Sequence, residues 1–212
     1  MRFFVLLISM CCGFSPIAHA ETYSQANTLL FFTNHLQHTE TPSSIAYTFS
    51  KKGTVEEGFT DTIQLKISQG TTGKNVHVDY FSQDRRQLFP DVNDAQGNPI
   101  LLLFLQRSVQ ELQRLAPVGH WRYFQNQVKI ALEESATVKE IQFNYHDKTL
   151  TGKEISFYPF KDNPKFTAYP DYQQTLYRLI LSEQVTGGVY QLSWQVVGTA
   201  SAPLLLETLT MD

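Results

Sequence analysis

Apolar and polar residues alternate in short segments along most of the chain, and turn-forming residues separate these segments. Ile45, Tyr47 and Phe49 are spaced two apart, with polar or small residues between them. The same period recurs later in the chain, at residues 59–67, 76–80, 141–145, 155–159, 175–181, 190–196 and 204–210. Since neighbouring side chains of a strand point to opposite faces, these segments predict an antiparallel sheet with one apolar and one polar face.

Apolar spacings of three and four residues predict three helices. The first covers residues 24–38, and Thr41-Pro42 is expected to end it. The second runs from Pro99 to Ala116 with Asn98 as its N-cap, and the third runs from His120 to about Ser135. The second helix is the best available cover for the apolar face of the sheet.

The second helix opens with six apolar residues, Ile100 to Leu105, which leave it no polar side at this end. Six residues span only about 9 Å at a rise of 1.5 Å per residue, so the run is too short to cross a membrane. We therefore expect these first turns to be buried on every side, under the sheet, another helix or a ligand.

The order of these elements predicts an α+β fold. A curved antiparallel sheet of about eight strands, an incomplete barrel or half-barrel, would be covered by the inserted helical pair, with a helix in front of it. Pro159 indicates that its strand ends there or lies at an edge. A two-layer α/β sandwich is the alternative arrangement.

The first twenty residues have the pattern of a secretory signal peptide. Arg2 is followed by an apolar stretch from Phe3 to Phe14, and Ala18-His19-Ala20 provides small residues for cleavage after Ala20. Residues 21–212 would then form a single exported domain without a transmembrane segment. The periplasm is the expected location, and release into the medium is the alternative.

Cysteine content and charge exclude several functions for the mature chain. The full sequence has two cysteines, Cys11 and Cys12, and both lie in the predicted signal peptide, so the mature chain has none. Disulfides, thiolate metal sites and cysteine nucleophiles are then excluded. Removal of Arg2 leaves 16 basic residues against 20 acidic ones, a formal charge of −4. This mild acidity argues against nucleic acid as a partner and against adhesion to an anionic membrane surface.

The sequence contains no common catalytic signature, since G-x-S-x-G, S-x-x-K and H-E-x-x-H are all absent. His35 and His38 are compatible with metal ligation on the first helix, but a solvated helix end is the simpler interpretation. His77 and Asp79 share one side of a strand, which leaves open a hydrolase with an unrecognised site. We assign no catalytic residue, no metal site and no cofactor, and a non-enzymatic protein is favoured.

Two sets of residues form binding hypotheses. One set is large and apolar and would line a cavity between the helical pair and the sheet, although core filling is the simpler interpretation. Its members are Phe104, Leu105, Trp121, Tyr123, Phe124 and Trp194. The other set consists of arginines that would hold a carboxylate or phosphate head group, with local salt bridges as the simpler interpretation. It comprises Arg107 and Arg122, together with Arg85, Arg86 and Arg114.

In the order of its elements the chain resembles the outer-membrane lipoprotein carriers of the periplasm. That resemblance implies an incomplete barrel with a helical lid that holds acyl chains. The leading hypothesis is therefore a non-enzymatic exported binding or accessory protein, with a lipid or other amphiphile as ligand. The alternative is an interaction module that docks on an envelope protein through a sheet edge or through aromatic residues of segment 144–160.

Overall fold

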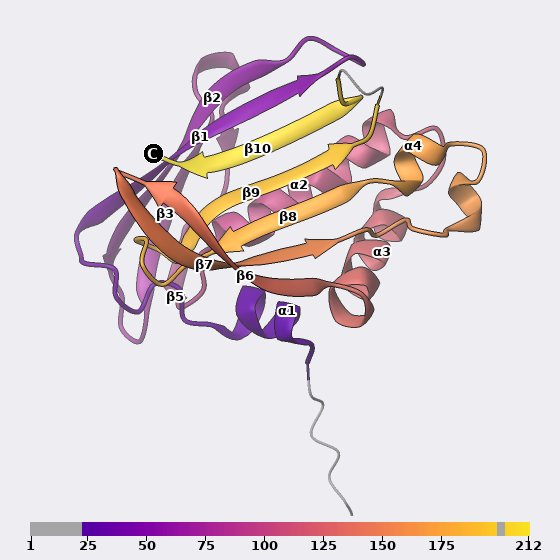
Figure 1. The fold of residues 1–212 in the computed structure, drawn as a ribbon. Helices are drawn as coiled ribbons and strands as arrows, with labels where there is room; N and C mark the ends of the chain where they lie inside the picture. Colours follow the sequence, from indigo (N-terminus) through magenta and orange to yellow (C-terminus); the bar gives the residue numbers. More distant parts are fainter. Residues whose placement is uncertain (1–22, 199–201) are drawn as a thin grey trace, which may run out of the picture.

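A single antiparallel sheet runs through the computed structural model, which describes residues 23–198 and 202–212 (Figure 1). The predicted signal peptide lies outside the described residues. In chain order the strands are β1 (Ser43–Gly53), β2 (Phe59–Gln69), β3 (Lys74–Tyr80), β4 (Gln87–Leu88), β5 (Val92–Ala95), β6 (Thr137–Tyr145), β7 (Lys148–Phe157), β8 (Leu176–Leu181), β9 (Val189–Val196) and β10 (Leu205–Met211). Their spatial order is β4-β3-β2-β1-β10-β9-β8-β7-β6, and β5 pairs with β3.

The predicted α+β class with a curved, open antiparallel sheet is confirmed. Eight long strands correspond to the eight alternating segments, and β4 and β5 are two short additional strands in the connection 82–96, where no alternating segment was identified. That connection pairs with the exposed edge of β3, where free backbone groups are available. The described strands leave the sheet open, with β4 and β5 at one edge and β6 at the other.

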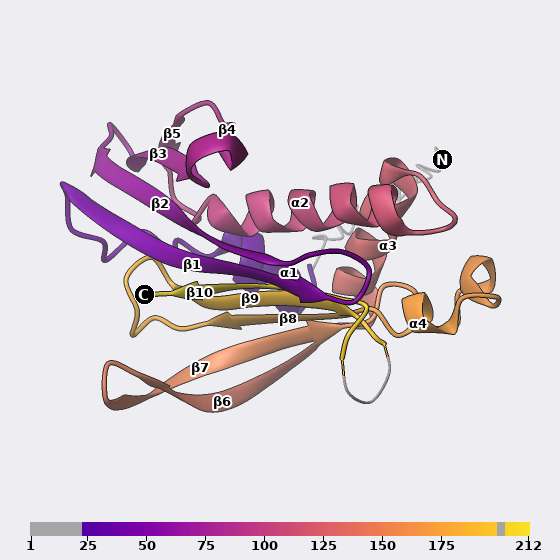
Figure 2. The ribbon, with the colours of Figure 1, turned by 90° about the horizontal axis from the view of Figure 1, so that it is seen from above.

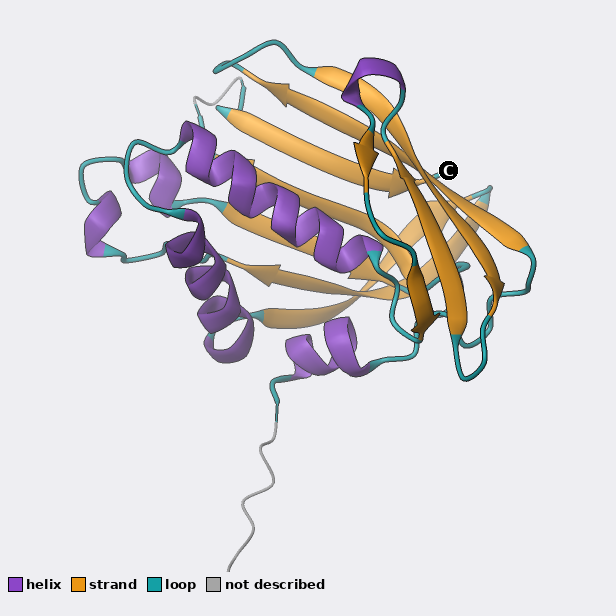
Figure 3. Cartoon of the chain, turned by 180° about the vertical axis from the view of Figure 1, so that it is seen from behind, coloured by secondary structure: helices purple, strands orange, loops and turns teal. Residues whose placement is uncertain are grey.

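Helices cover one face of the sheet, which we call the inner face. Helix α2 (Ile100–Leu115) lies along this face, and α3 (Trp121–Glu134) follows it at the β6 side (Figures 2 and 3). Both helices were predicted to within two residues at each end. In the described part of the chain, no helix combines the length and the hydrophobicity needed to cross a membrane.

The start of α2 is buried on one side only, so the expectation of burial all round is wrong. The side chains of Ile100, Leu101, Phe104 and Leu105 are buried, but Leu102 is 61% exposed. The reason is geometric: a helix lying on a sheet has a single face in contact with it, and residue 102 falls on the side away from that face. The predicted cap is present, because the Oδ1 atom of Asn98 accepts the backbone N–H of Ile100 (3.1 Å).

The predicted first helix is much shorter than its periodicity indicated. An α-helical turn, α1 (Gln25–Asn27), continues as a π-helical turn, η1 (Thr28–Phe32), and Thr33 is already extended. Beyond Thr33, hydrogen bonds to other parts of the chain replace the helical hydrogen bonds. The Leu36 N–H donates to the carbonyl of Gln96, and a ring nitrogen of His35 lies 2.8 Å from the carbonyl of Leu29.

On the opposite, outer face, the hairpin of β6 and β7 crosses other strands of the sheet (Figure 1). Strand β7 pairs with β8 only from Lys153 onward, and Gly152 marks the departure. A Cβ atom at Gly152 would lie 2.6 Å from the carbonyl oxygen of Leu181, so the close approach requires glycine. Phe143 then stacks on Tyr190 of β9, with ring centroids 4.1 Å apart.

Three short helices complete the described chain: η2 (Gln83–Arg85), η3 (Pro164–Phe166) and α4 (Pro170–Gln173). Strand β7 ends at Phe157, before Pro159, as the proline predicted. The connection that follows packs Phe160 and Phe166 against Phe124 of α3, and this aromatic group closes one end of the core.

Gly119, between α2 and α3, is a sensitive position. Its φ angle is +112°, and a Cβ atom there would lie 2.4 Å from the Phe124 ring. We expect Gly119→Ala to lower the free energy of unfolding by about 1–3 kcal/mol, measured by urea denaturation. Gly97→Ala is the matched control, because its Cβ would meet only His35, at 3.7 Å. Equal effects of the two substitutions would contradict this account.

Candidate functional site

The inner face under α2 is built largely from aromatic side chains. They come from five strands and are at most 1% exposed: Tyr47 and Phe49 of β1, Tyr80 of β3, Phe157 of β7, Tyr177 of β8 and Trp194 of β9. The Tyr177 ring stacks between Phe157 and Trp194, at centroid distances of 4.7 and 6.0 Å. Its hydroxyl donates to Ser108 Oγ of α2 (2.9 Å). The contact between helix and sheet thus combines a broad aromatic surface with a few polar groups.

A group of six charged side chains lies along one edge of this contact, and we call it the α2 ion cluster. Its members are Lys51, Glu56, Arg107, Glu111, Arg114 and Glu207. Lys51 Nζ lies 2.6 Å from Glu111, and Arg114 lies 2.6 Å from both Glu56 and Glu111. Three cations therefore face three carboxylates, so the cluster is balanced in charge when all six groups are ionised.

Glu207 is the deepest charge of the cluster and is fully buried. Its Oε1 accepts from Arg107 (2.7 Å), and its Oε2 accepts the indole N–H of Trp194 (3.0 Å). Burial raises the pKa of the Glu207 carboxyl, against the opposing effect of Arg107. At the exposed end of the cluster, the hydrogen bond from Arg114 lowers the pKa of Glu56 to about 2.

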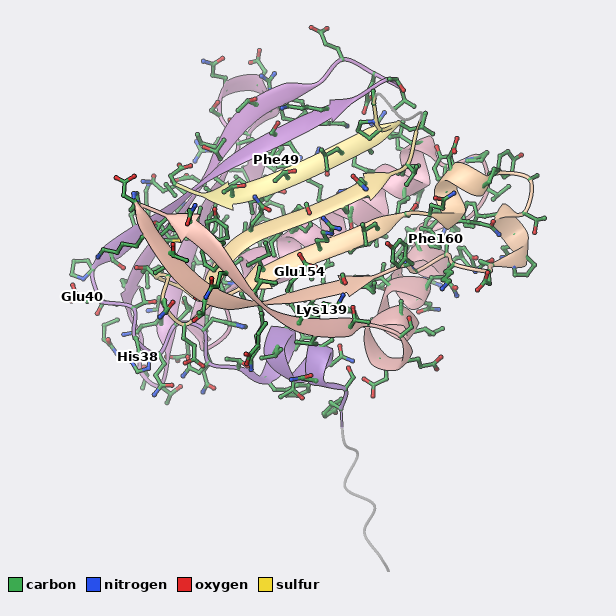
Figure 4. All side chains as sticks on the ribbon, in the orientation of Figure 1. His38, Glu40, Phe49, Lys139, Glu154 and Phe160 are labelled. Carbon is green, nitrogen blue, oxygen red and sulfur yellow. The ribbon has the colours of Figure 1, made fainter. Side chains whose placement is uncertain are left out.

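Arg107 connects the ionic and the aromatic parts of the site. Its guanidinium carbon lies 4.9 Å from the ring centroid of Phe49 and 5.1 Å from that of Phe81, in cation–π contact. In Figure 4, Phe49 of β1 lies near the middle of the sheet, whereas Phe160, which belongs to the aromatic group around α3, lies at the side of α4. The ion cluster and the α3 aromatic group are therefore separate places in the fold.

Little free space remains between α2 and the sheet. A void of about 10 Å³ lies beside Glu111 and Trp194, also lined by Leu112 and Leu205. This volume suits roughly one water molecule. The inner face is thus packed in the described structure.

The predicted binding residues fall into three places. Phe104 and Leu105 are buried on the sheet side of α2, and Arg107 and Trp194 meet at Glu207. Phe124 packs in the separate aromatic group of α3. Trp121 is 39% exposed, and Arg122 stacks on its ring (5.1 Å), so this pair lies on the surface. The other predicted arginines pair locally: Arg85 with Asp61, Arg86 with Asp79 and Arg114 with Glu111.

The sequence analysis did not select three residues at the contact between α2 and the sheet: Lys51, Tyr80 and Glu207. The alternation of inward and outward positions in β1 and β10 could have identified the two charged residues. Glu207 stands between Leu205 and Leu209 in the alternation of β10, and Lys51 continues the alternation of Tyr47 and Phe49. A charged residue at an inward position of an apolar strand face needs a buried partner, so this pattern marks a buried ion pair.

His77 lies outside the inner face, between two carboxylates on the outer side of β3. Its Nδ1 is 2.7 Å from Asp91 and its Nε2 is 3.4 Å from Asp79, which also pairs with Lys66 and Arg86. The hydrogen bond to Asp91 raises the pKa of His77. Because each ring nitrogen faces a carboxylate, the imidazole is placed to donate a hydrogen bond on both sides, which is the geometry of an ion pair.

An open groove of about 300 Å³ runs past His77 and Asp91, between them and Pro42, Lys66 and Asn75. Within residues 23–198 and 202–212, no three His, Cys, Asp or Glu side chains are placed to hold a metal ion. His35 and His38, the pair considered for metal ligation, lie beyond the end of η1 rather than on a helix face.

Glu207→Leu is expected to destabilise the protein strongly, because it leaves Arg107 buried without its closest carboxylate. The expected loss is about 3–5 kcal/mol in the free energy of unfolding, measured by urea denaturation. The double substitution of Glu207→Leu with Arg107→Met should recover much of this loss, since it removes both charges. Glu140→Leu on exposed β6 is the control, with an expected change within about 0.5 kcal/mol. If Glu207→Leu changed the free energy of unfolding as little as Glu140→Leu does, the Arg107–Glu207 pair would not contribute to stability as described.

The raised pKa of His77 gives a pH dependence with a defined sign. The protonated imidazole stabilises the fold below its unfolded pKa of roughly 6.5, and this contribution is lost as pH rises through the higher folded pKa. NMR titration of the His77 ring is expected to give a pKa above the ordinary value. Asp91→Asn should lower that pKa, whereas Asp84→Asn, in the same connection, should leave it unchanged. Equal shifts in both variants would contradict the assigned pairing.

No protein-family model and no curated protein matches this sequence. Among solved structures, the chain is similar to the crystal structure of lipoprotein LppX from Mycobacterium tuberculosis. The TM-score is 0.36 and the sequence identity is 10%. The match covers 89% of this chain and 95% of that chain.

Proposed function

We propose that this protein is a non-enzymatic exported binding protein that holds an amphiphile between the inner face and α2. The observation that carries the proposal is that the contact between α2 and the sheet has an apolar part beside a charged part. A broad aromatic surface, suited to an apolar tail, adjoins the partly buried α2 ion cluster, suited to a polar head. Export and a periplasmic location belong to the proposal, through the predicted signal peptide of residues 1–20.

The ion cluster itself favours a role beyond stability. Buried ion pairs lose hydration, and replacement by apolar side chains of similar volume is often neutral or stabilising. In stability alone, apolar side chains in place of Arg107 and Glu207 would hold α2 on the sheet about as tightly. A binding site, in contrast, needs polar groups at fixed positions for orientation.

Uptake of a ligand requires α2 to move. Ligand pockets typically have volumes of roughly 300–1,000 Å³, far above the void of about 10 Å³ beside Trp194. Displacement of α2 from the sheet would release the space that Phe104, Leu105 and Leu112 fill. The segment Ala116 to His120, which joins α2 to α3, supplies the connection about which such a movement turns.

A second candidate function, docking on an envelope protein, is favoured by an exposed aromatic pair. Tyr23 and Phe32 stack at 4.4 Å and are 51% and 59% exposed. Exposed apolar groups in contact with one another are typical of interaction sites. Segment 144–160 supports this candidate less, because Phe157 and Phe160 are buried and only Tyr158 among its large apolar side chains is markedly exposed.

Native mass spectrometry with solvent extraction tests the proposal on protein exported from a bacterial host. We expect a co-purifying lipid or other amphiphile. Leu105→Gln, on the buried side of α2, should abolish the co-purification, because a polar side chain disrupts the apolar surface that holds the tail. Leu102→Gln is the matched control, since the same change on the exposed side of the same helix should retain the ligand.

Thermal unfolding of each variant shows that it is folded before its cargo is compared. A bare protein mass, with no amphiphile in the extract and no thermal stabilisation by added lipids, would contradict the proposal. Cross-linking through the Tyr23 and Phe32 surface would then be the measurement for the docking candidate.

A further inference from the structure

Two buried hydrogen-bond donors at the inner face have no partner among the described residues. They are the Nε–H of Arg107 and the hydroxyl of Tyr80. The Tyr80 side chain is 1% exposed, and the Nε atom of Arg107 is also shielded from solvent. Buried donors are nearly always paired in folded proteins, since an unpaired one costs about 1–3 kcal/mol. These two atoms therefore need an explanation.

Both donors belong to the same part of the contact between α2 and the sheet. The Tyr80 ring lies 4.5 Å from the ring centroid of Phe81, and the Arg107 guanidinium carbon lies 5.1 Å from that same centroid. The charge of Arg107 also acts on Tyr80: burial raises the pKa of the tyrosine, and Arg107 works to lower it. One donor thus comes from α2 and the other from β3, on the two sides of the contact that opens when α2 moves, so an acceptor atom that enters there would bridge them.

We propose that these two donors bind a neutral oxygen acceptor, an ester or amide carbonyl, in the head of the amphiphile. An N–H and an O–H together recognise an acceptor oxygen. This inference rests on the proposed function, because it assigns the head-group position of the same ligand. It also names the chemical class of the cargo: acyl esters or amides rather than free fatty acids.

Charge is the reason that the acceptor is neutral. The α2 ion cluster is already balanced, and Arg107 already pairs with Glu207 at 2.7 Å. Glu111 lies 3.8 Å from the same guanidinium, so Arg107 already faces two carboxylates. An anionic head would meet the repulsion of these carboxylates without an unpaired cation to offset it, whereas a carbonyl oxygen carries no net charge.

The test compares decanoyl probes with the same tail and different heads: methyl decanoate, decanamide and sodium decanoate. Binding to the delipidated mature chain is measured at neutral pH by calorimetry. We expect the ester and the amide to bind at least about tenfold more tightly than the carboxylate, the difference expected for a charged head facing unscreened carboxylates.

Tyr80→Phe isolates the proposed contact. It should weaken the binding of the ester and the amide about threefold to tenfold, the value of one hydrogen bond, and leave decanoate binding unchanged. The thermal stability of the free variant should not fall, because the lost hydroxyl has no partner in the described chain. Tyr123→Phe on α3 is the matched control, away from the inner face beside Lys165, and should leave all three affinities unchanged.

The possible failures are distinguishable. Decanoate binding as tight as ester binding, or a Tyr80→Phe variant with unchanged selectivity, would overturn the head-group assignment and leave the proposed function intact. An absence of binding for all three probes, together with the absence of any co-purified amphiphile, would overturn the proposed function and this inference with it.

Discussion

The burial of the Glu207 carboxylate under α2 is the constraint on which the arrangement of helix and sheet depends. A buried carboxylate must be hydrogen-bonded, and Glu207 receives its bonds from Arg107 of α2 and Trp194 of β9. A shift of α2 by one turn, about 5.4 Å, would unpair both Arg107 and Glu207. The aromatic surface alone would allow several helix positions, whereas this pair selects one.

The same constraint relates packing to the proposed function. The inner face is filled, and the void beside Trp194 holds roughly one water molecule. If the proposed function holds, the affinity for an amphiphile depends on the free energy needed to displace α2 from the sheet, because no preformed cavity lies between them in the described part of the chain. Ion pairs hold one edge of α2 on the sheet. Near the C-terminal end of the helix, the Gln113 side chain accepts the backbone N–H of Trp121 (3.0 Å), which connects α2 to α3.

The outer face of the sheet is covered by a hairpin rather than by helices, and its polar contacts connect parts of the sheet to one another. The β6–β7 hairpin crosses it, and Tyr145 donates its hydroxyl to the carbonyl of Asp212 at the chain end (2.8 Å). His77 and Asp91 tie the short strands β4 and β5 to β3. The open edge at β4 is only two residues long, and β6 exposes Lys139, which are two ways in which natural sheets discourage pairing with another chain.

The sequence by itself determined the fold class, the eight long strands and the limits of α2 and α3. The reason is that the periods of two and of about 3.6 residues are local properties, set by backbone geometry and recorded in each segment. Even the inward positions of Lys51 and Glu207 were present in the alternation of β1 and β10.

Only the tertiary structure decided which of these side chains meet. The early end of the first helix, the exposure of Leu102 and the separation of Phe124 from Trp194 follow from the docking of elements distant in sequence. The α2 ion cluster joins residue 51 to residues near 110 and to residue 207, across the order of the strands. A single sequence records which residues face inward, but strand order and helix placement determine their partners.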